Sequence, residues 1–335
     1  MKHILLIATG GTIASKHTGT GLSPQISGEE LLSYIPEAQK TCQIDVIQPF
    51  SLDSTNVSWQ QWLLLSELIQ KNYDFYDGFV LCHGTDTMAY TSAALSYLVM
   101  NSKKPIIITG AQKPIDLPDT DARTNLTDSI RFAADDRSHD VCIVFGGSVI
   151  AGTRAKKEKT KSYNAFSSIN YPPIAVIQDR RIIFYIDDKG QNKKEVVFSD
   201  RLGGKVFLYR LIPGSDGEIL DILIDRYDAL IIESFGVGGI PDYGDGSIKA
   251  AIDRWISAGK IVIMATQVTN EGSDMSVYEV GHAVKNIYDL PESYDMTLEA
   301  VIAKTMWILG KTKDRKEFRE IFYTTVNHDL LFLPE

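Results

Sequence analysis

The sequence has few of the residues that support a disulfide-rich or membrane-bound protein. Its 335 residues include only three cysteines, Cys42, Cys82 and Cys142, so neither a disulfide framework nor a zinc site is indicated. No apolar run approaches the roughly 20 residues that a transmembrane helix needs. The first apolar run, residues 4–8, is also too short for the core of a signal peptide. We therefore expect a cytoplasmic protein in which the cysteines stay reduced.

An excess of positive charge is also missing. Lys and Arg number 34 against 43 Asp and Glu, which gives a formal net charge of −9. Proteins that bind nucleic acid or anionic membranes present a basic surface. The one basic cluster, residues 154–161, is short enough to be a solvated loop. We expect neither nucleic acid nor a membrane among the partners.

Several catalytic signatures are absent as well. The sequence has no Gly-x-Ser-x-Gly elbow, no Walker A pattern and no Gly-x-Gly-x-x-Gly after its first apolar run. The six histidines do not have the spacing of metal ligands. We therefore expect no metal ion and no organic cofactor.

What the sequence does contain is a regular alternation of apolar, β-branched runs with longer amphipathic segments. This alternation predicts parallel β-α-β units and an α/β fold, with a larger N-terminal parallel or mixed sheet flanked by helices and a smaller C-terminal α/β domain. Two of the expected helices begin with capping-box spacing, Ser27 with Glu30 and Ser58 with Gln61. The expected strands are 4–8, 44–47, 79–82, 105–109, 141–145, 206–211, 230–233 and 261–265, and the expected helices are 29–35, 59–71, 88–100, 122–134, 247–257, 298–309 and 315–323.

A polar stretch without periodicity, residues 187–194, interrupts this alternation and predicts an exposed linker. The chain is also too long for one ordinary hydrophobic core. We therefore predict an N-terminal domain over 1–185, a linker over 186–205 and a C-terminal domain over 206–335.

Small and hydroxyl residues follow each strand of the expected N-terminal sheet. Because the carboxyl ends of parallel strands open on the same edge of a sheet, we expect these segments to surround one crevice that binds a polar small molecule. In strand order they are Thr9-Gly10-Gly11-Thr12, Asp53-Ser54-Thr55-Asn56, His83-Gly84-Thr85-Asp86-Thr87, Gly110-Ala111-Gln112 and Gly146-Gly147-Ser148.

The groups at this edge suit nucleophilic chemistry on a small polar substrate. Backbone N–H groups on glycine turns stabilise a developing oxyanion, and Asp86 offers a negative charge to a ligand ammonium. A threonine hydroxyl becomes a nucleophile when a base lies beside it. A lysine from residues 154–161 is the obvious base, because burial lowers the pKa of a lysine.

Structural roles for the same residues remain open at this stage. Gly10-Gly11 can be a tight turn with Thr12 as a helix cap, and Asp86 can cap the helix that begins near residue 88. Ser54 and Thr55 can likewise form a turn or cap before the next helix. For His83 we expect packing at a strand end rather than catalysis.

Two of these segments together resemble a known family. Thr9-Gly10-Gly11-Thr12-Ile13-Ala14-Ser15 and His83-Gly84-Thr85-Asp86-Thr87, in this order and each at a strand end, resemble the bacterial-type L-asparaginases. The order of elements agrees over essentially the whole chain, and the missing signal peptide makes it similar to the cytosolic, type I-like branch. The resemblance implies hydrolysis of L-asparagine to L-aspartate and ammonia by a homodimer or homotetramer.

The resemblance also implies a role for each matching residue. Thr12 is the expected nucleophile, and Asp86 is the expected partner of the substrate α-ammonium. We further expect the backbone amides of Gly11 and Thr85 to help form the oxyanion hole. Lys156 and Lys159 are neighbouring alternatives to the lysine that matches the family. The expected catalytic residues are Thr12, Thr85, Asp86 and Lys157, and the expected substrate-binding residues are Asp53, Ser54, Thr55, Thr85 and Asp86.

The sequence departs from the family in the loop after Thr12. Many members have a tyrosine there that helps to activate the threonine, whereas residues 17–24 contain none and Leu22 stands in the corresponding region. We expect this glycine-rich loop to be mobile when empty and to close over substrate. Tyr278 is a hypothetical replacement for the missing hydroxyl, with ordinary packing as the alternative.

Three other functions remain open. A glutaminase-asparaginase differs in its substrate by one methylene, which a pocket discriminates by only about 1–3 kcal/mol. A non-catalytic amino-acid sensor on the same fold agrees with the missing tyrosine. Relatives that act on misacylated tRNA carry an additional N-terminal domain, and the net charge of −9 disfavours RNA.

Overall fold

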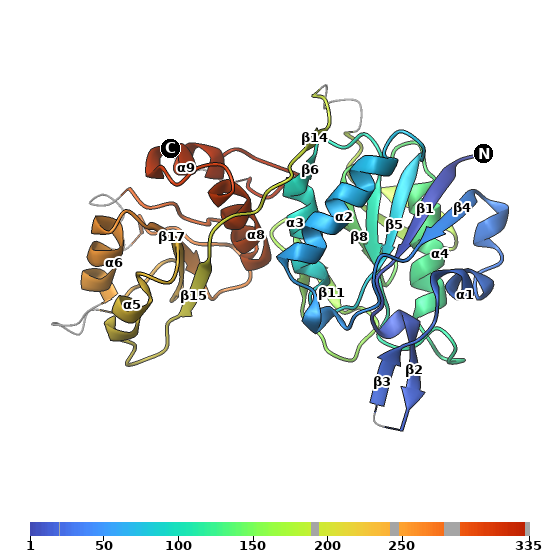
Figure 1. Cartoon of the computed structure of the whole chain (residues 1–335), viewed down its shortest axis with the longest axis horizontal. Helices are drawn as coiled ribbons and strands as arrows, with labels where there is room; N and C mark the ends of the chain where they lie inside the picture. The colour runs from blue at the N-terminus through green and yellow to red at the C-terminus, as the bar shows by residue number, and fades with distance from the viewer. Residues whose placement is uncertain (20, 189–193, 242–247, 278–288, 332–335) are drawn as a thin grey trace. The chain divides into compact units, whose positions relative to one another are not determined.

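The computed structural model describes residues 1–19, 21–188, 194–241, 248–277 and 289–331 (Figure 1). The chain divides into two compact units, Met1–Asp200 and Arg201–Glu335. The expected two-domain α/β architecture is therefore confirmed. The predicted linker over 186–205 includes residues outside the described ranges, so its extent stays a prediction.

The first unit is built on an eight-stranded mixed sheet with the order β13-β12-β9-β8-β7-β5-β1-β4. Five neighbouring strands, from β4 to β8, are parallel, as the alternation of strands and helices predicts. The other three add antiparallel pairs at one edge. The strands are β1 (His3–Ala8), β4 (Gln43–Ile47), β5 (Gly78–Cys82), β7 (Ile106–Thr109), β8 (Val141–Phe145), β9 (Ser148–Ala151), β12 (Ala175–Gln178) and β13 (Arg181–Phe184).

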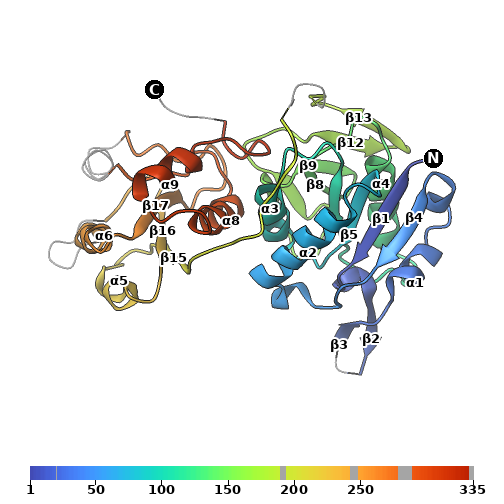
Figure 2. The same cartoon turned by 45° about the horizontal axis from the view of Figure 1, so that its top comes forward.

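Four helices cover the two faces of this sheet. Figures 1 and 2 show α1 (Gly28–Ser33) and α4 (Ala122–Ala133) on one face, and α2 (Trp59–Asn72) and α3 (Met88–Leu98) on the other. Both expected capping pairs are present. The Ser27 hydroxyl accepts the Glu30 amide at 3.1 Å, and the Gln61 side chain accepts the Ser58 amide at 2.9 Å. The helix expected to reach residue 100 ends earlier, because β6 (Val99–Met100) pairs with β14 (Val197–Phe198).

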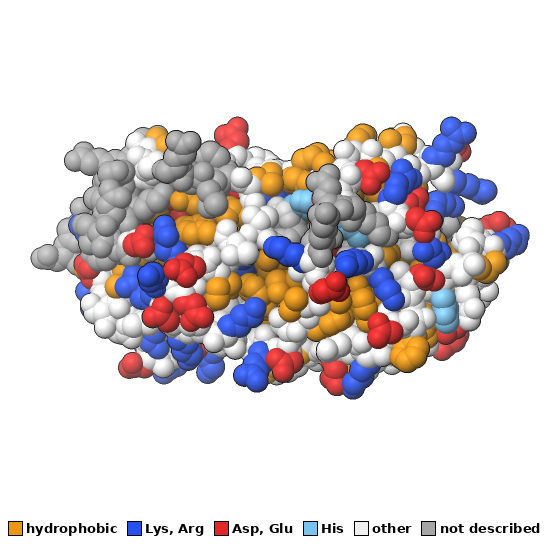
Figure 3. All heavy atoms as spheres, turned by 90° about the horizontal axis from the view of Figure 1, so that it is seen from above, with side chains coloured by type: hydrophobic (Ala, Val, Ile, Leu, Met, Phe, Trp, Pro, Cys, Tyr) orange, Lys and Arg blue, Asp and Glu red, His pale blue; other side chains and the backbone are white. Residues whose placement is uncertain are grey.

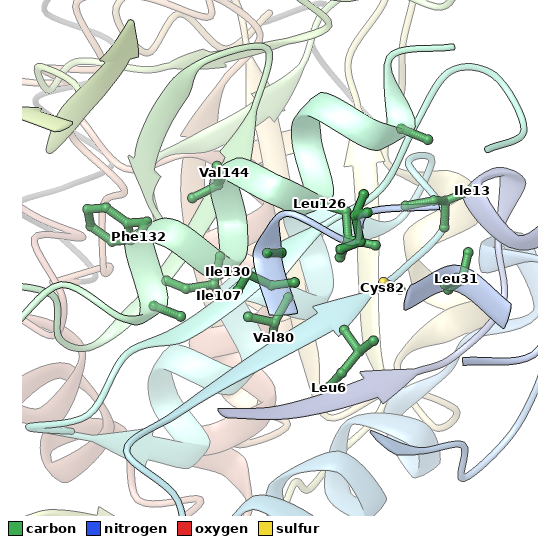
Figure 4. Packing of buried hydrophobic residues seen from close by; sticks show 14 of the residues in the cluster. Leu6, Ile13, Leu31, Val80, Cys82, Ile107, Leu126, Ile130, Phe132 and Val144 are labelled. Atoms are coloured by element: carbon green, nitrogen blue, oxygen red, sulfur yellow. The ribbon is translucent and has the colours of Figure 1, made fainter. Parts of the chain in front are cut away.

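The core of this unit explains why its central strands are apolar along their whole length. Figure 4 shows Leu6, Val80 and Ile107 from three strands packed towards Leu126 and Ile130 of α4. The intervening strand residues are buried on the opposite face, as expected for a sheet covered by helices on both sides. The cysteines are part of this packing: burial raises the pKa of the Cys82 thiol to about 12, so that it is an inert hydrophobic side chain.

Shorter elements lie between the main strands and helices of the first unit. Two hairpins are formed by β2 (Ser15–Thr18) with β3 (Gly21–Pro24) and by β10 (Ala155–Lys157) with β11 (Phe166–Ser168). Three single-turn 3-10 helices are η1 (Thr12–Ala14), η2 (Ala38–Lys40) and η3 (Ser54–Asn56). Two of them, η1 and η3, contain predicted site residues.

The second unit has a three-stranded parallel sheet of β15 (Val206–Arg210), β16 (Ala229–Ser234) and β17 (Ile261–Thr266). Its helices are α5 (Glu218–Leu223), α6 (Ile248–Ser257), α8 (Leu298–Leu309) and α9 (Arg315–Phe322). The indole of Trp255 on α6 is fully buried in the core and donates to the Leu220 carbonyl oxygen at 2.9 Å.

A buried ion pair ties α8 to the C-terminal segment of this unit. Lys304 Nζ donates to Asp329 Oδ2 at 2.6 Å and to the Thr324 carbonyl oxygen at 2.8 Å, and neither charged side chain is exposed to solvent. Burial lowers the pKa of Lys304, and the Asp329 carboxylate opposes that shift. The other oxygen of Asp329 accepts the Val326 amide at 2.8 Å. One carboxylate thus fixes both a helix and a turn.

The surface shows no segregation of charge in the view of Figure 3, where acidic and basic side chains are interspersed. Among the described residues, no helix is long and apolar enough to cross a membrane. The same residues include no group of three or more His, Cys, Asp or Glu side chains that is arranged to hold a metal ion.

Candidate active site

The carboxyl ends of β1 and β5 meet through glycine. A Cβ atom added to Gly11 would lie 2.4 Å from the Cα atom of Gly84, which no side chain tolerates. Gly10 is equally confined, because its added Cβ would lie 2.5 Å from the carbonyl oxygen of Leu52. Both Gly10 and Gly11 also have positive φ angles, 101° and 78°. Thr12 and Thr85 each follow this contact directly in the chain, so glycine packing brings the two segments together.

The segment after β4 is fixed against the same point. Gly84 approaches Ser54, whose Oγ would lie 2.7 Å from an added Cβ. The Thr87 hydroxyl donates to the Ser54 carbonyl oxygen at 2.7 Å, and Ser54 is buried. Asp53 and Thr55 are exposed and hydrogen-bonded to each other. The Asp53 carboxylate accepts the Thr55 backbone amide at 2.9 Å and the Thr55 hydroxyl at 2.7 Å. The structure therefore shows a capping role for Asp53 at η3.

Lys157 joins two of the predicted catalytic residues. Its Nζ donates to Thr85 Oγ1 at 2.7 Å and to Asp86 Oδ1 at 2.6 Å. The lysine comes from β10, far along the chain, and its side chain is 15% exposed against 59% for Asp86. A lysine held against a buried hydroxyl and a carboxylate can exchange protons with the hydroxyl. The predicted cluster of Thr85, Asp86 and Lys157 is thus assembled as a set of contacts.

The structural alternative for Asp86 is wrong. Thr87, not Asp86, occupies the N-cap position of α3, and the Asp86 carboxylate is engaged by Lys157. Thr87 is fixed in turn by its hydrogen bond to the Ser54 carbonyl oxygen. Asp86 is therefore oriented by the lysine rather than by the helix.

His83 packs beneath the site. It is fully buried, and its Nδ1 lies 2.7 Å from the Gly84 carbonyl oxygen. A carbonyl only accepts, so Nδ1 carries the proton and Nε2 accepts the Thr91 hydroxyl at 3.0 Å. The Thr91 oxygen accepts the Trp62 indole N–H at 2.9 Å. Burial lowers the pKa of His83 to about 4, which keeps it neutral and agrees with the expected packing role.

We expect His83 to make the first unit less stable in acid. Its pKa is about 4 in the folded state and about 6.5 when unfolded, so the unfolded chain binds the proton more readily between these values. This contribution is present above pH 6.5 and is lost as the pH falls towards 4. Lowering the pH from 7.5 to 5 should remove about 2 kcal/mol of unfolding free energy through this group.

Denaturant titrations of wild type and His83→Asn at both pH values isolate that contribution. Asparagine keeps a donor for the Gly84 carbonyl oxygen but does not titrate. The variant should be less stable at pH 7.5, and the difference should shrink at pH 5. Parallel losses in the two proteins would contradict the assignment.

The fifth strand end continues into a hairpin that was not predicted. Gly146 and Gly147 have φ angles of 58° and 76° and form a two-residue turn, so that β8 reverses directly into β9 with Phe145 opposite Ser148. Because β8 runs parallel to β7, its end still opens on the expected edge of the sheet, and the feature not predicted is the direct turn into β9. Two glycines between apolar runs are a hairpin signal, and the physical reason is that both residues of such a turn need positive φ.

The segment after Thr12 also differs from expectation. The segment expected to be a glycine-rich loop forms the β2–β3 hairpin, with Leu22 opposite His17, and residue 20 lies outside the described residues. Leu22 is 46% exposed. Closure of this hairpin over a substrate stays a prediction. Tyr278, the hypothetical source of a replacement hydroxyl, lies outside the described residues.

One half of the expected oxyanion hole is already engaged. The Gly11 amide donates to the Leu52 carbonyl oxygen at 2.9 Å, as part of the contact between the first two strand ends. Gly11 is therefore not available as an oxyanion donor in this structure, which corrects that expectation. The backbone amide of Thr85 stays a predicted donor to the oxyanion.

Two buried polar residues beside the site, Asp121 and Asn125, were not predicted from the sequence. Asn125 is on α4, and Asp121 is the residue before this helix. Asn125 donates to the Gly110 carbonyl oxygen at 3.0 Å, and Asp121 accepts the Gln112 amide at 2.9 Å. Polar residues one turn apart on the apolar side of an otherwise amphipathic helix were the available signal.

Comparison with known proteins places this arrangement in a family. A family profile described as Asparaginase, N-terminal matches residues 3–189, and one described as Glutaminase/Asparaginase C-terminal domain matches residues 205–322. The chain belongs to the asparaginase family. The resemblance of the two threonine motifs to asparaginases is thereby confirmed.

Relatives within the asparaginase family fall into two groups. An L-asparaginase of Thermococcus kodakarensis is 34% identical over 319 residues, which cover 95% of this chain and 96% of that protein. A glutamyl-tRNA(Gln) amidotransferase subunit of Pyrococcus furiosus is also 34% identical, over 334 residues, which cover 96% of this chain but 75% of that protein. Sequence identity therefore does not separate the two groups.

Solved structures of asparaginases share the whole fold. The thermostable L-asparaginase from Thermococcus kodakarensis has a TM-score of 0.91 at 32% identity, covering 99% of this chain and 100% of that one. L-asparaginase I from Vibrio cholerae has a TM-score of 0.87 at 29% identity, with 99% of each chain covered. The second likeness agrees with the type I-like branch expected from the sequence.

Proposed function

We propose that this protein is an L-asparaginase that hydrolyses L-asparagine to L-aspartate and ammonia, with Thr12 as the nucleophile. The observation that carries the proposal is the contact of Lys157 Nζ with Thr85 Oγ1 and Asp86 Oδ1, 2.7 and 2.6 Å away. It supplies a proton-transfer pair beside the segment that bears Thr12. Structural similarity to two L-asparaginases supports the choice of substrate.

The proposed reaction has two displacement steps. Thr12 Oγ1 attacks the side-chain amide carbon of asparagine and loses its proton, and the C–N bond breaks as the nitrogen gains a proton and leaves as ammonia. A water molecule then attacks the resulting ester, releases L-aspartate and returns the proton to Thr12. Thr85 and Lys157 relay protons in these steps, as a hydroxyl and an amine in hydrogen-bond contact can.

Substrate recognition is assigned to the groups around this centre. The Asp86 carboxylate, more than half exposed, binds the α-ammonium group. The segment Asp53-Ser54-Thr55 binds the α-carboxylate, and the packing of Ser54 against Gly84, the residue before Thr85, supports this assignment. We further propose a cytoplasmic homo-oligomer, a homodimer or homotetramer, that needs no cofactor.

The second candidate is a role within a tRNA-dependent amidotransferase, which the relatives named as amidotransferase subunits favour. One observation weighs against it: the formal net charge of −9 opposes binding to tRNA.

Ammonia release from L-asparagine and L-glutamine by the purified protein tests the proposal. We expect turnover of free L-asparagine without any partner protein, and a kcat/KM for L-glutamine lower by about tenfold or more, because one methylene is worth about 1–3 kcal/mol. Lys157→Met serves as the inactive control. Binding of L-asparagine without turnover would indicate a sensor, and activity only on glutamylated tRNA would indicate the amidotransferase role. Comparable rates on both amino acids would indicate a glutaminase-asparaginase.

A further inference from the structure

A polar network at the start of α4 has no assigned role in the reaction above. Asp121 is 7% exposed, and its two carboxylate oxygens accept the backbone amide of Gln112 at 3.0 and 2.9 Å and that of Lys113 at 3.1 Å. Asn125, 1% exposed, donates to Asp121 at 3.2 Å. A buried carboxylate that accepts several N–H groups is a strong, directional anchor. It fixes the backbone of the two residues that follow Ala111.

Asn125 extends this anchor to two neighbouring strands. Its amide group donates to the Gly110 carbonyl oxygen at 3.0 Å, and its Oδ1 accepts the Gly146 amide at 2.9 Å. Gly110 follows β7 and Gly146 follows β8. One side chain therefore holds the ends of two adjacent strands at a fixed separation.

The Gln112 side chain binds the loop that follows β10, the strand that ends in Lys157. Its Nε2 donates to the carbonyl oxygens of Lys159 and Ser162, at 3.3 and 3.1 Å. Both acceptors lie in the connection between β10, which ends at Lys157, and β11. The Gln112 side chain thus links the segment after β7 to the loop of the β10–β11 hairpin.

Tyr163 in the same loop makes two further contacts. The Tyr163 hydroxyl donates to the Asp119 carbonyl oxygen, and the Lys113 ammonium lies 5.8 Å from the centre of the Tyr163 ring. The β10–β11 hairpin needs such support, because it contains only three residue pairs and two-stranded hairpins of this kind are marginal alone.

We propose that Asp121, Asn125 and Gln112 form a bracket that positions Lys157 against Thr85 and Asp86. Asp121 and Asn125 fix the backbone at Gln112, and Gln112 fixes the loop whose first strand ends in Lys157. The three are positioning residues, since they act on the reaction through the lysine. Their consequence for turnover rests on the proposed function, whereas their effect on Lys157 does not.

The bracket predicts a specific response at Gln112. Gln112→Glu keeps the shape of the side chain but replaces two donors with a carboxylate that repels the carbonyl oxygens of Lys159 and Ser162. Lys157 then loses its fixed position. Displacements of about 1 Å in a proton-transfer group are costly, so kcat for L-asparagine should fall about tenfold or more. Gln112→Met loses the two donors without adding a charge, so its kcat should lie between that of the wild type and that of Gln112→Glu.

Chemical labelling of Lys157 tests the bracket without reference to activity. The protein is treated briefly with an amine-reactive reagent, and peptides are quantified by mass spectrometry against Lys71, whose side chain is 70% exposed. In wild type Lys157 is 15% exposed and engaged by two partners, so it should react slowly. In Gln112→Glu it should react several-fold faster. The matched control is Gln39→Glu, which removes one donor to a backbone carbonyl oxygen, that of Leu32, outside the bracket.

The two measurements separate the possible outcomes. Faster labelling and lower kcat in Gln112→Glu, with Gln39→Glu unchanged in both, support the bracket. Unchanged Lys157 labelling in Gln112→Glu overturns it, whatever the activity. Faster labelling without a change in kcat overturns its catalytic consequence. If the wild-type protein does not hydrolyse L-asparagine, the proposed function fails while the labelling still tests the positioning of Lys157.

Discussion

Replacement of Thr12 by alanine is expected to reduce kcat for L-asparagine by on the order of 10³-fold or more, because loss of the proposed nucleophile leaves only binding and electrostatic stabilisation. The substitution should leave the site otherwise intact. Thr12 belongs to the single turn η1, which directly follows the close backbone contacts of Gly10 and Gly11, and the substitution leaves both glycines unchanged. Steady-state ammonia release measures the effect.

Two controls separate chemistry from binding in this experiment. Thr12→Ser keeps a hydroxyl and should retain measurable turnover, whereas Thr12→Ala should still bind L-aspartate in calorimetry. Rapid quenching of the wild-type reaction followed by mass spectrometry should detect an ester on Thr12. An alanine variant with near wild-type kcat would remove Thr12 as the nucleophile. Loss of L-aspartate binding in Thr12→Ala would instead place the threonine in substrate recognition.

Replacement of Lys304 by methionine is expected to destabilise the second unit by about 3–5 kcal/mol, because breaking a buried ion pair by removing one of its two members is strongly destabilising. Both side chains are fully buried, and Lys304 also satisfies the Thr324 carbonyl oxygen at 2.8 Å. Denaturant titration of the two proteins at pH 7.5 measures the difference.

The second unit contains a matched control for this experiment. Lys313 Nζ lies 2.7 Å from Asp228 Oδ1, almost the same separation, but the lysine is 67% exposed. Lys313→Met should therefore cost less than about 1 kcal/mol. The double variant Lys304→Met/Asp329→Asn should recover part of the loss, since it removes both charges of this pair and the asparagine carbonyl can still accept the Val326 amide. Equal losses in the two lysine variants would show that burial does not govern this pair.

The regular part of the fold was predictable from sequence because its strands and helices have strong local patterns. The parallel strands are buried on both faces, so runs such as residues 141–145 are apolar throughout and have sharp ends. A mixed sheet was allowed by the prediction, but the individual strands of the antiparallel edge were not predicted. β12 and β13 are short, and β13 alternates between exposed and half-buried residues, which is a weak signal. The end of the helix at Leu98 also depends on a distant partner, since β6 pairs with β14 almost a hundred residues later.

The candidate site was predictable to the level of segments rather than of contacts. The Gly-Thr motifs mark the ends of β1 and β5. The family resemblance selects Lys157 from the neighbouring lysines, and Lys157 contacts Thr85 and Asp86 in the structure. The roles of these residues stay predictions. The engagement of the Gly11 amide by Leu52 was not predictable, because it depends on how two strand ends approach each other. The same holds for Gln112, whose two acceptors are separated from it by some fifty residues.

The glycine contacts have a consequence for how this protein can acquire a new substrate preference. At Gly10, Gly11 and Gly110 an added Cβ atom would meet backbone atoms 2.2–2.5 Å away, so these positions accept no other residue without moving a neighbouring strand end. A mutant library over this edge should retain glycine at all three after any selection for folded protein. Adaptation is then confined to side chains beside an unchanging backbone frame and to the turn of the β2–β3 hairpin, where an added Cβ at Gly19 would meet nothing within 4 Å.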